Sequence, residues 1–172
     1  MPEAENALLG LKATAFAYNG KEPSDVKTSL FTDGKIALKA DAWSGRIWDG
    51  GAFVSYRLSD SPNGTRMRNV RVTTTHVNNT RSEVRIDALL VKTASGGDTW
   101  FALPNSSCIG PDDNVRLPNN QAMYARADGS FLVLDATDLR IEFSAQQQNS
   151  WVGISEIESS CKPYRGLAVI IR

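Results

Sequence analysis

Residues 139–158 read LRIEFSAQQQNSWVGISEIE, and this stretch decides the fold class. Apolar and charged residues alternate over 139–143, which is the period of a strand with one buried face. The polar run 146–150 interrupts the pattern in the way that a turn does. Alternation then resumes over 151–158 and ends in two carboxylates. We therefore predict two strands joined by a short polar turn, which together form a hairpin.

The rest of the chain repeats this signal. Runs rich in β-branched and aromatic residues recur, with turn residues between them about every 8–12 residues. Further strands are expected at 12–18, 52–58, 66–75, 83–92, 99–103, 123–127 and 131–135. Helical signals are scarce. The pattern is typical of an all-β protein, either a sandwich or a barrel, with little helix.

Length and charge narrow the class of protein. A chain of 172 residues is long enough for one well-cored domain and short for two, so we expect a single domain over 1–172. The 19 basic and 19 acidic residues balance, which argues against a nucleic-acid partner, because such partners call for a basic excess. No apolar run reaches the roughly 18 residues of a membrane helix, and we do not expect membrane binding.

The two cysteines, Cys108 and Cys161, leave two interpretations open. Each follows a pair of serines in a loop-like segment, so a disulfide between them is one interpretation. Two free, partly buried thiols are the other. With only one histidine in the chain, the two cysteines cannot complete a tetrahedral metal site.

A glycine-rich stretch at 43–51, which we expect to be a loop, contains Trp43, Arg46 and Trp48. Large aromatic side chains in such a loop either plug the end of a sandwich or form a platform on which a ligand stacks. The plug is the commoner use of any one tryptophan.

The stretch at 76–81 is the second candidate binding loop. It supplies an imidazole, two amides and a guanidinium, which are hydrogen-bonding partners that sugar hydroxyls use. These groups belong to His76, Asn78, Asn79 and Arg81. A lone histidine in a loop is more often only solvated, and that alternative stays open.

Two further features carry charge. The Asp33-Gly34 turn places a carboxylate beside backbone carbonyls, which suits a hard cation such as Ca²⁺. The alternative is an aspartate that only caps its own turn. On the expected strand 66–75, Arg66, Arg68 and Arg71 form either a patch for phosphate or acidic sugars or a solvated face. The balanced total charge favours the solvated face.

Signatures of catalysis are missing. The sequence has no nucleophile elbow, P-loop, dinucleotide-binding glycine pattern or zinc-protease helix. A Ser-His-Asp triad would have to use His76, and no Gly-x-Ser-x-Gly accompanies it. Paired carboxylates for glycoside hydrolysis stay open, because their separation is spatial. We expect that the chain is not an enzyme.

Three segments together resemble the galactose-binding-like jelly-roll superfamily, which includes discoidin domains and family 32 carbohydrate-binding modules. They occur in the family's order. They are LFTDG at 30–34 followed by Trp43, the strand at 84–92 that leads through Gly97-Asp98-Thr99 to Trp100, and Arg140-Ile-Glu followed by WVGISEIE at 151–158. The resemblance implies an antiparallel jelly-roll sandwich of about eight strands, whose loops at one end hold ligand.

The resemblance also implies site residues. In this superfamily a structural Ca²⁺ often sits between the first loop and a glutamate of the final strand, which implies Asp33 and Glu156 as ligands. The alternative for the second residue is a surface glutamate on an edge strand. Family sugar sites often combine a histidine and an arginine with an aromatic platform, which implies His76, Arg81 and one of the two loop tryptophans.

The function implied by the resemblance is that of a non-catalytic carbohydrate-binding module cut from a larger secreted glycan-active protein. Its partner is then a glycan or polysaccharide, and its location is extracellular. A discoidin-like module that binds protein or phospholipid is the alternative, and Arg46 and Trp48 would serve it. A small polysaccharide-active enzyme or a structural accessory domain is the third hypothesis.

Overall fold

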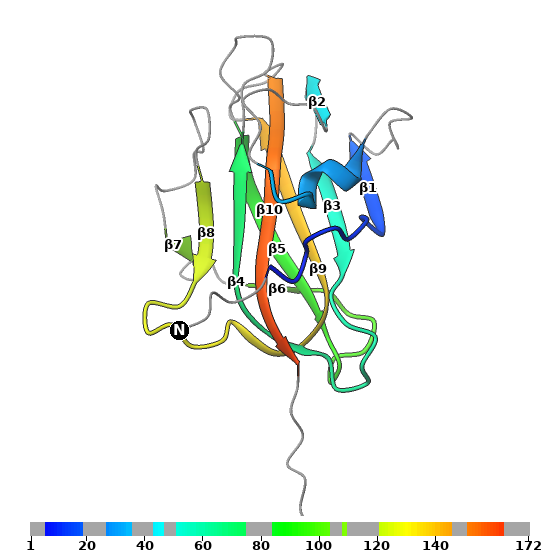
Figure 1. The fold of residues 1–172 in the computed structure, drawn as a ribbon, viewed down its shortest axis with the longest axis vertical. Coiled ribbons are helices and arrows are strands. Elements are labelled where there is room, and N and C mark those ends of the chain that lie inside the picture. The colour runs from blue at the N-terminus through cyan, green and yellow to red at the C-terminus, as the bar shows by residue number, and fades with distance from the viewer. Residues whose placement is uncertain are drawn as a thin grey trace, which may run out of the picture.

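The computed structural model describes residues 6–18, 27–35, 43–46, 51–74, 84–103, 108–109, 121–145 and 151–163. These ranges contain ten strands and one short 3₁₀ helix (Figure 1). The elements are β1 (Ala15–Tyr18), η1 (Thr28–Thr32), β2 (Trp43–Arg46), β3 (Ala52–Arg57), β4 (Thr65–Thr74), β5 (Val84–Thr93), β6 (Phe101–Ala102), β7 (Cys108–Ile109), β8 (Gln121–Ala125), β9 (Val133–Ala145) and β10 (Trp151–Pro163).

The all-β prediction is confirmed. Eight of the ten strands have four residues or more, in agreement with the expected number of about eight. The other two, β6 and β7, have two residues each. Within the described ranges, no helix has the length and hydropathy to cross a membrane.

The strands form one antiparallel sheet that curls into two facing layers (Figure 1). One layer has the order β1-β3-β9-β5-β6, and the other has the order β7-β8-β4-β10-β2. Strand β9 belongs to both layers. Near its start, Val133 and Ala136 pair with β4, whereas residues further along pair with β3 and β5. The result is the predicted β-sandwich.

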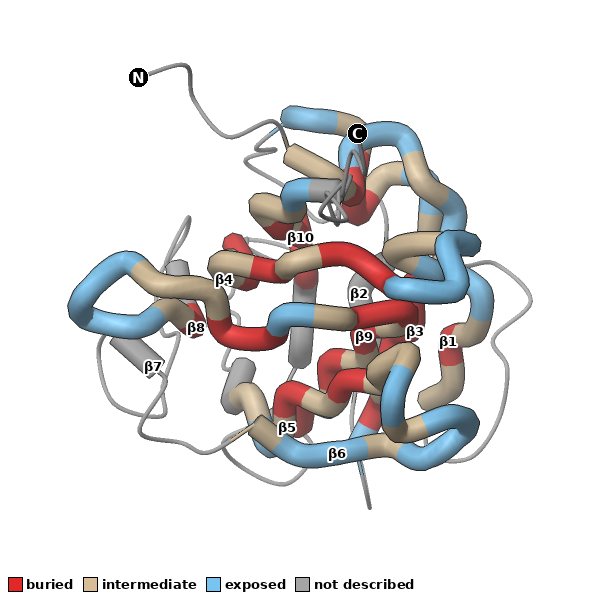
Figure 2. The backbone as a smooth tube through the Cα atoms, turned by 90° about the horizontal axis from the view of Figure 1, so that it is seen from below, coloured by how far each residue is buried: buried red, intermediate tan, exposed pale blue. Residues whose placement is uncertain are grey.

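Figure 2 shows that buried residues recur along the strands of both layers, and their side chains form the core. On β9 the apolar residues of the alternating pattern are buried, and the charged residues between them are partly exposed. Among the buried apolar side chains of this strand and of the facing strand β4 are Leu139, Ile141, Phe143, Met67, Val70 and Val72. Burial of each large apolar side chain contributes about 1.5–3 kcal/mol, so this alternation is what selects the inward face.

The predicted hairpin over 139–158 is wrong in its pairing, although both of its strands exist. Strand β9 pairs with β3, β4 and β5, whereas β10 pairs with β4 and β2. No pairing joins β9 to β10 among the described residues. Alternation shows that one face of a strand is buried, but it does not show which strand lies beside it. Here the two strands face each other across the core.

A β-bulge interrupts β10. The register of β10 against β4 shifts between Ile154 and Glu156, so Ser155 is the extra residue. The extra residue breaks the two-residue period, and Ile154 and Ile157 therefore both lie in the core. The strict alternation predicted for 151–158 therefore fails at the bulge, where 154–157 are all buried.

Cys161 is a free, half-buried thiol whose pKa is raised by burial. Cys108 lies on β7, and β8 and β4 separate β7 from β10. Three strand spacings amount to about 14 Å, whereas a disulfide needs Cα atoms within about 7 Å. The structure therefore favours the free-thiol interpretation.

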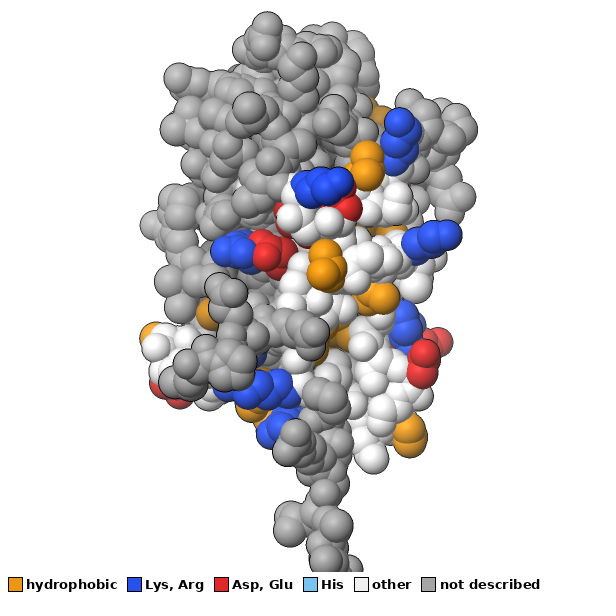
Figure 3. All heavy atoms as spheres, in the orientation of Figure 1, with side chains coloured by type: hydrophobic (Ala, Val, Ile, Leu, Met, Phe, Trp, Pro, Cys, Tyr) orange, Lys and Arg blue, Asp and Glu red, His pale blue; other side chains and the backbone are white. Residues whose placement is uncertain are grey.

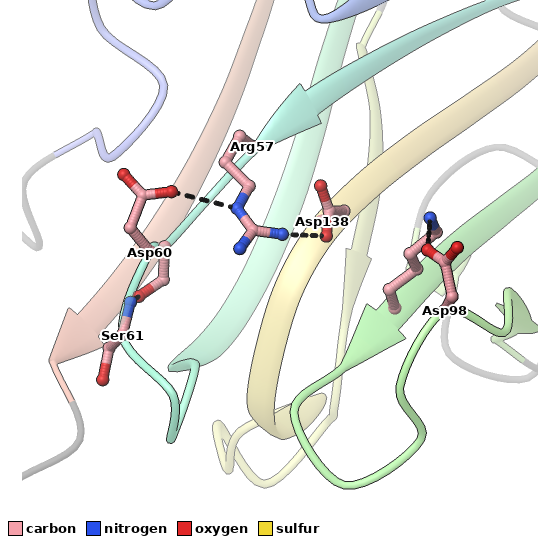
Figure 4. A network of polar contacts seen from close by, with 7 residues as sticks. Arg57, Asp60, Ser61, Asp98 and Asp138 are labelled. Carbon is pink, nitrogen blue, oxygen red and sulfur yellow. Dashed lines mark hydrogen bonds and ion pairs between the residues drawn. The ribbon is translucent and has the colours of Figure 1, made fainter.

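Ion pairs orient the turns at the lower end of the molecule. Arg57 of β3 lies between Asp60 and Asp138, with nitrogen–oxygen distances of 3.2 and 2.8 Å (Figure 4). Lys92 of β5 pairs with Asp98 in the turn that follows. Such exposed pairs typically contribute only about 0–1 kcal/mol each, so their role is orientation rather than stability.

Candidate functional site

The loop end of the sandwich is the end at which β2, the last residues of β4 and the first residues of β10 meet (Figure 1). Trp43 of β2 and Thr74 of β4 both pair with Ile154 of β10, from its two sides. Trp43 and Arg46 thus lie in a strand, although the glycine-rich composition predicted a loop. The unpaired edge of β10 supplies backbone partners, and these override the weak strand propensity of the segment.

Most of the predicted sugar-binding side chains lie outside the described residues. These are Trp48, His76, Asn78, Asn79 and Arg81, and of Trp43 and Arg46 only the backbone is described. Within the first candidate stretch the described backbone breaks off at Arg46, and before the second stretch it ends at Thr74; both residues lie at the loop end. The grouping of the side chains into one site stays a prediction.

The Asp33-Gly34 turn follows η1 and is held against the core by Phe31. The centroid of the Phe31 ring lies 5.9 Å from the centroid of the Phe16 ring. Gly34 has φ = +78°, a left-handed conformation that favours glycine. The Asp33 carboxylate accepts a hydrogen bond of 2.9 Å from the backbone N–H of Lys35. The predicted turn is therefore confirmed, and its aspartate caps it.

Glu156 of β10 meets this turn from the other end of the sequence. Its Oε1 atom accepts a hydrogen bond of 3.2 Å from the backbone N–H of Gly34. The side chain is 2% exposed, and β10 has neighbours on both sides, so the alternative of a surface glutamate on an edge strand is wrong. The structure brings Asp33 and Glu156 to one corner, beside Trp43 and Ile154 of the loop end.

The buried half of this corner is polar and incompletely hydrogen-bonded. Within the described residues, Oε2 of Glu156 has no hydrogen-bond partner, and neither do the hydroxyls of Tyr56 and Thr73. Thr73 lies opposite Glu156 in the register of β4 and β10. Buried polar atoms without partners are rare in folded proteins, and they often mark a bound water or ion.

Electrostatics single out the same carboxylate. Burial raises the pKa of Glu156 to about 8, and the negative charges of Asp33 and Glu158 contribute to the rise, while the N–H of Gly34 opposes it. Burial, together with the charge of Glu156, also raises the pKa of Tyr56. At neutral pH Glu156 is thus protonated unless a cation offsets its charge.

The donor set fits a hard cation. Ca²⁺ takes six to eight oxygen ligands, and the corner offers Oε2 of Glu156, which has no partner among the described residues, beside the carboxylate of Asp33. In the part of the chain that the structure describes, no three His, Cys, Asp or Glu residues cluster, so the other ligands would be backbone, hydroxyl or water oxygens. This composition does not suit zinc, which prefers nitrogen and sulfur ligands.

Glu158, the second of the two carboxylates that end the stretch 139–158, has a different role. Arg71 of β4 binds it through two hydrogen bonds of 2.6 Å, in a bidentate geometry. Arg71 is therefore engaged within the sheet, which separates it from the two other arginines of the same strand.

Sequence reasoning missed the hydroxyls of Tyr56 and Thr73. Tyr56 and Thr73 lie in the expected strands 52–58 and 66–75, and no local signal connects either hydroxyl to Glu156. Their positions depend on the register of β4 against β10 and on the bulge, which no short motif encodes.

No protein-family model matches the chain, and no curated protein is similar to it in sequence. Several solved structures share its fold. Chitosan-binding module 1 of a chitosanase/glucanase from Paenibacillus aligns with a TM-score of 0.55 at 13% identity, over 90% of this chain and 98% of the module. The family 32 carbohydrate-binding module of EndoD from Streptococcus pneumoniae aligns with a TM-score of 0.53 at 14% identity, over 90% and 98%.

The lectin-binding domain of lectinolysin, solved with Lewis b, aligns with a TM-score of 0.54 at 11% identity, over 91% of this chain and 96% of that domain. An F5/8 type C domain from Bacteroides fragilis has the same fold, with a TM-score of 0.50. The chain thus has the fold of family 32 carbohydrate-binding modules and discoidin-type domains, as its resemblance to the galactose-binding-like superfamily predicted.

Proposed function

We propose that the chain is a non-catalytic carbohydrate-binding module whose sugar site lies at the loop end. The observation that carries the proposal is the fold, which a module named for binding chitosan and a lectin domain solved with Lewis b share over at least 90% of this chain. Strand β2 supports it, because pairing with β10 fixes the backbone of Trp43 at the loop end. The proposal places the module in a larger secreted protein that acts on glycans.

The binding chemistry follows from the residue types. An aromatic ring, that of Trp43 or Trp48, stacks on the apolar face of a sugar. Polar groups then fix its orientation through hydrogen bonds, from His76, Asn78, Asn79 and Arg81. A single shallow site of this kind gives a dissociation constant of roughly 10 μM to 1 mM.

A glycan array followed by calorimetry tests the proposal. Of Trp43→Ala and Trp48→Ala, the variant that removes the stacking ring is expected to weaken sugar binding about tenfold or more. The matched control is Trp100→Ala. The Trp100 ring packs against Arg140 and Lys92, at 4.5 and 4.9 Å, beside β5 and β9. This variant should keep wild-type affinity.

Two results would overturn the proposal: a folded protein that binds no glycan, or unchanged binding by both loop-end variants. Sedimentation with anionic liposomes provides the comparison with a lipid-binding discoidin domain. Binding to the vesicles without binding to any glycan would replace the sugar site with a lipid site.

We also propose that a structural Ca²⁺ occupies the corner between Asp33 and Glu156. Glu156 would hold it through Oε2, which has no other partner among the described residues, and Asp33 through its carboxylate. The cation would neutralise two neighbouring carboxylates and connect the last described strand to the turn after η1. Its role is to support the loop end rather than to take part in a reaction.

Thermal melting tests this second proposal. EDTA should lower the melting temperature, and added Ca²⁺ should restore it. A ligand that binds the folded state but not the unfolded state stabilises the folded state. Asp33→Asn should abolish the difference. Asp60→Asn is the matched control, since that side chain is exposed and pairs with Arg57 at the other end of the molecule. A melting temperature that ignores EDTA removes Ca²⁺ from the corner.

A further inference from the structure

Two arginines of β4 lie over one aromatic ring. The guanidinium carbon of Arg66 is 4.9 Å from the centroid of the Phe131 ring, and that of Arg68 is 5.0 Å from it. Residues two apart on a strand project on the same side. The ring attracts both cations and restricts their orientations. Two positive groups that would otherwise repel each other are therefore held together.

Neither arginine has an acidic partner in the part of the chain that the structure describes. Their Nε atoms are buried and have no hydrogen-bond partner there. Three other cations of the same sheet are paired with carboxylates: Arg57 with Asp60 and Asp138 (Figure 4), Arg71 with Glu158, and Lys92 with Asp98. The Nε atoms are shielded from solvent, so an external ligand would bind the terminal nitrogens of the two guanidinium groups, whose charge no described carboxylate offsets.

The surroundings add positive charge. Lys162 of β10 lies opposite Arg66 in the register of the two strands, and it is exposed. On the other side, exposed Arg126 faces the carboxylate of Asp128, which also accepts a hydrogen bond from the N–H of Ser130. The charges of Arg126 and Asp128 therefore offset each other. Figure 3 shows basic side chains gathered at the lower end of the molecule, where β4 begins.

This cluster is remote from the loop end. Arg66 is the second residue of β4 and Thr74 is its last. At about 3.3 Å per residue, the eight steps between them span about 26 Å along the strand. A ligand at Arg66 and Arg68 therefore does not share the proposed sugar site.

We propose that Arg66 and Arg68 form a second binding site, which takes the sulfate or carboxylate group of an acidic glycan. Guanidinium groups present paired N–H donors that match the oxygens of such groups. Three clustered cations are few for the phosphate track of a nucleic acid, and the balanced total charge gives no long-range attraction to one. The site stands on its own observations and does not require the sugar site at the loop end.

Biolayer interferometry with immobilised polysaccharides tests the proposal at low and moderate salt. Dextran sulfate and polygalacturonate supply sulfate and carboxylate groups separately, and dextran is the neutral control. The full chain should bind at least one of the two acidic polymers and not dextran. Arg66→Gln with Arg68→Gln should weaken that binding about tenfold or more, because two charged hydrogen-bond donors are lost.

The matched control is Lys12→Gln with Lys27→Gln, which changes the net charge by the same amount at two exposed sites. It should keep the wild-type affinity for the acidic polymer. Arg68→Gln alone, and Arg66→Lys with Arg68→Lys, which keeps both charges, should each give an intermediate loss. A melting curve shows whether the double glutamine variant folds. If it does not fold, these two variants still test the proposal.

Several results would overturn the proposal. These are an absence of binding to both acidic polymers, equal loss in the lysine control, or tighter binding to a DNA duplex or to phosphatidylserine vesicles than to either polymer. The test separates the two sites. Arg66 and Arg68 variants should keep loop-end sugar binding, and Trp43→Ala should keep binding to the acidic polymer.

Discussion

At the scale of single residues, Glu156 is the most informative side chain, because its burial conflicts with its charge. In the folded protein without a cation its pKa is raised from 4.5 to about 8. Between these two values the folded state holds a proton that the unfolded state has released. The free energy of unfolding must therefore fall as the pH rises through that window.

We accordingly expect the melting temperature in EDTA to fall between pH 5 and pH 8 by more in the wild type than in Glu156→Gln, because the amide carries no charge at any pH. Melting curves of both proteins across this window measure the difference, and the glutamine variant subtracts all other titrating groups. A wild type that loses no more stability than the variant contradicts the raised pKa.

The resemblance predicted that Asp33 and Glu156 would lie together, and the structure places them so. The sequence could not predict that one oxygen of Glu156 would be buried without a partner among the described residues. That property depends on the bulge at Ser155 and on the packing of the turn after η1, both of which are consequences of tertiary structure.

At the scale of elements, the turn between β3 and β4 packs closely on β9. Gly64 has φ = +65°, and a Cβ atom there would lie 2.4 Å from the carbonyl oxygen of Asp135. A carbonyl oxygen in a paired strand cannot move away as a side chain can. The conformation and the close contact both require glycine at this position.

Gly64→Ala should therefore destabilise the protein by about 2–5 kcal/mol, combining left-handed strain with a backbone clash. Gly129→Ala is the control, because Gly129 has φ = +70° but a Cβ atom added there would meet nothing within 4 Å among the described residues. It should cost only about 1 kcal/mol. Urea unfolding measures both values, and equal losses would contradict the close contact.

The sequence predicted several strands to within a residue or two, as the expected ranges 52–58 and 83–92 show against Ala52–Arg57 and Val84–Thr93. It did not predict their partners. Alternation identifies the buried face of a strand, whereas the pairing depends on which edges are free when the sheet closes. For the same reason it missed β2, whose residues pair because β10 offers an edge.

At the scale of the whole molecule, β9 makes the two layers interdependent. Its first residues pair with β4 of one layer, and the remainder pairs with β3 and β5 of the other. Neither layer can lose β9 and keep its inner face covered. The layers should therefore unfold together.

We expect urea unfolding followed by far-ultraviolet circular dichroism to coincide with unfolding followed by tryptophan fluorescence, because a single cooperative transition gives one midpoint for every probe. Trp100 and Trp43 report on different layers, through their positions beside β5 and in β2. Two separated midpoints would show that the layers unfold independently.

The placement of β10 has a consequence for the order in which the protein folds. Its partners β2 and β4 come much earlier in the chain, and each has a free edge facing the position of β10 until that strand arrives. Pairings between such distant segments must first close long loops, which makes folding slow. A ribosome-bound chain that has not yet exposed β10 is thus expected to hold an incomplete sandwich, with its edges open to aggregation.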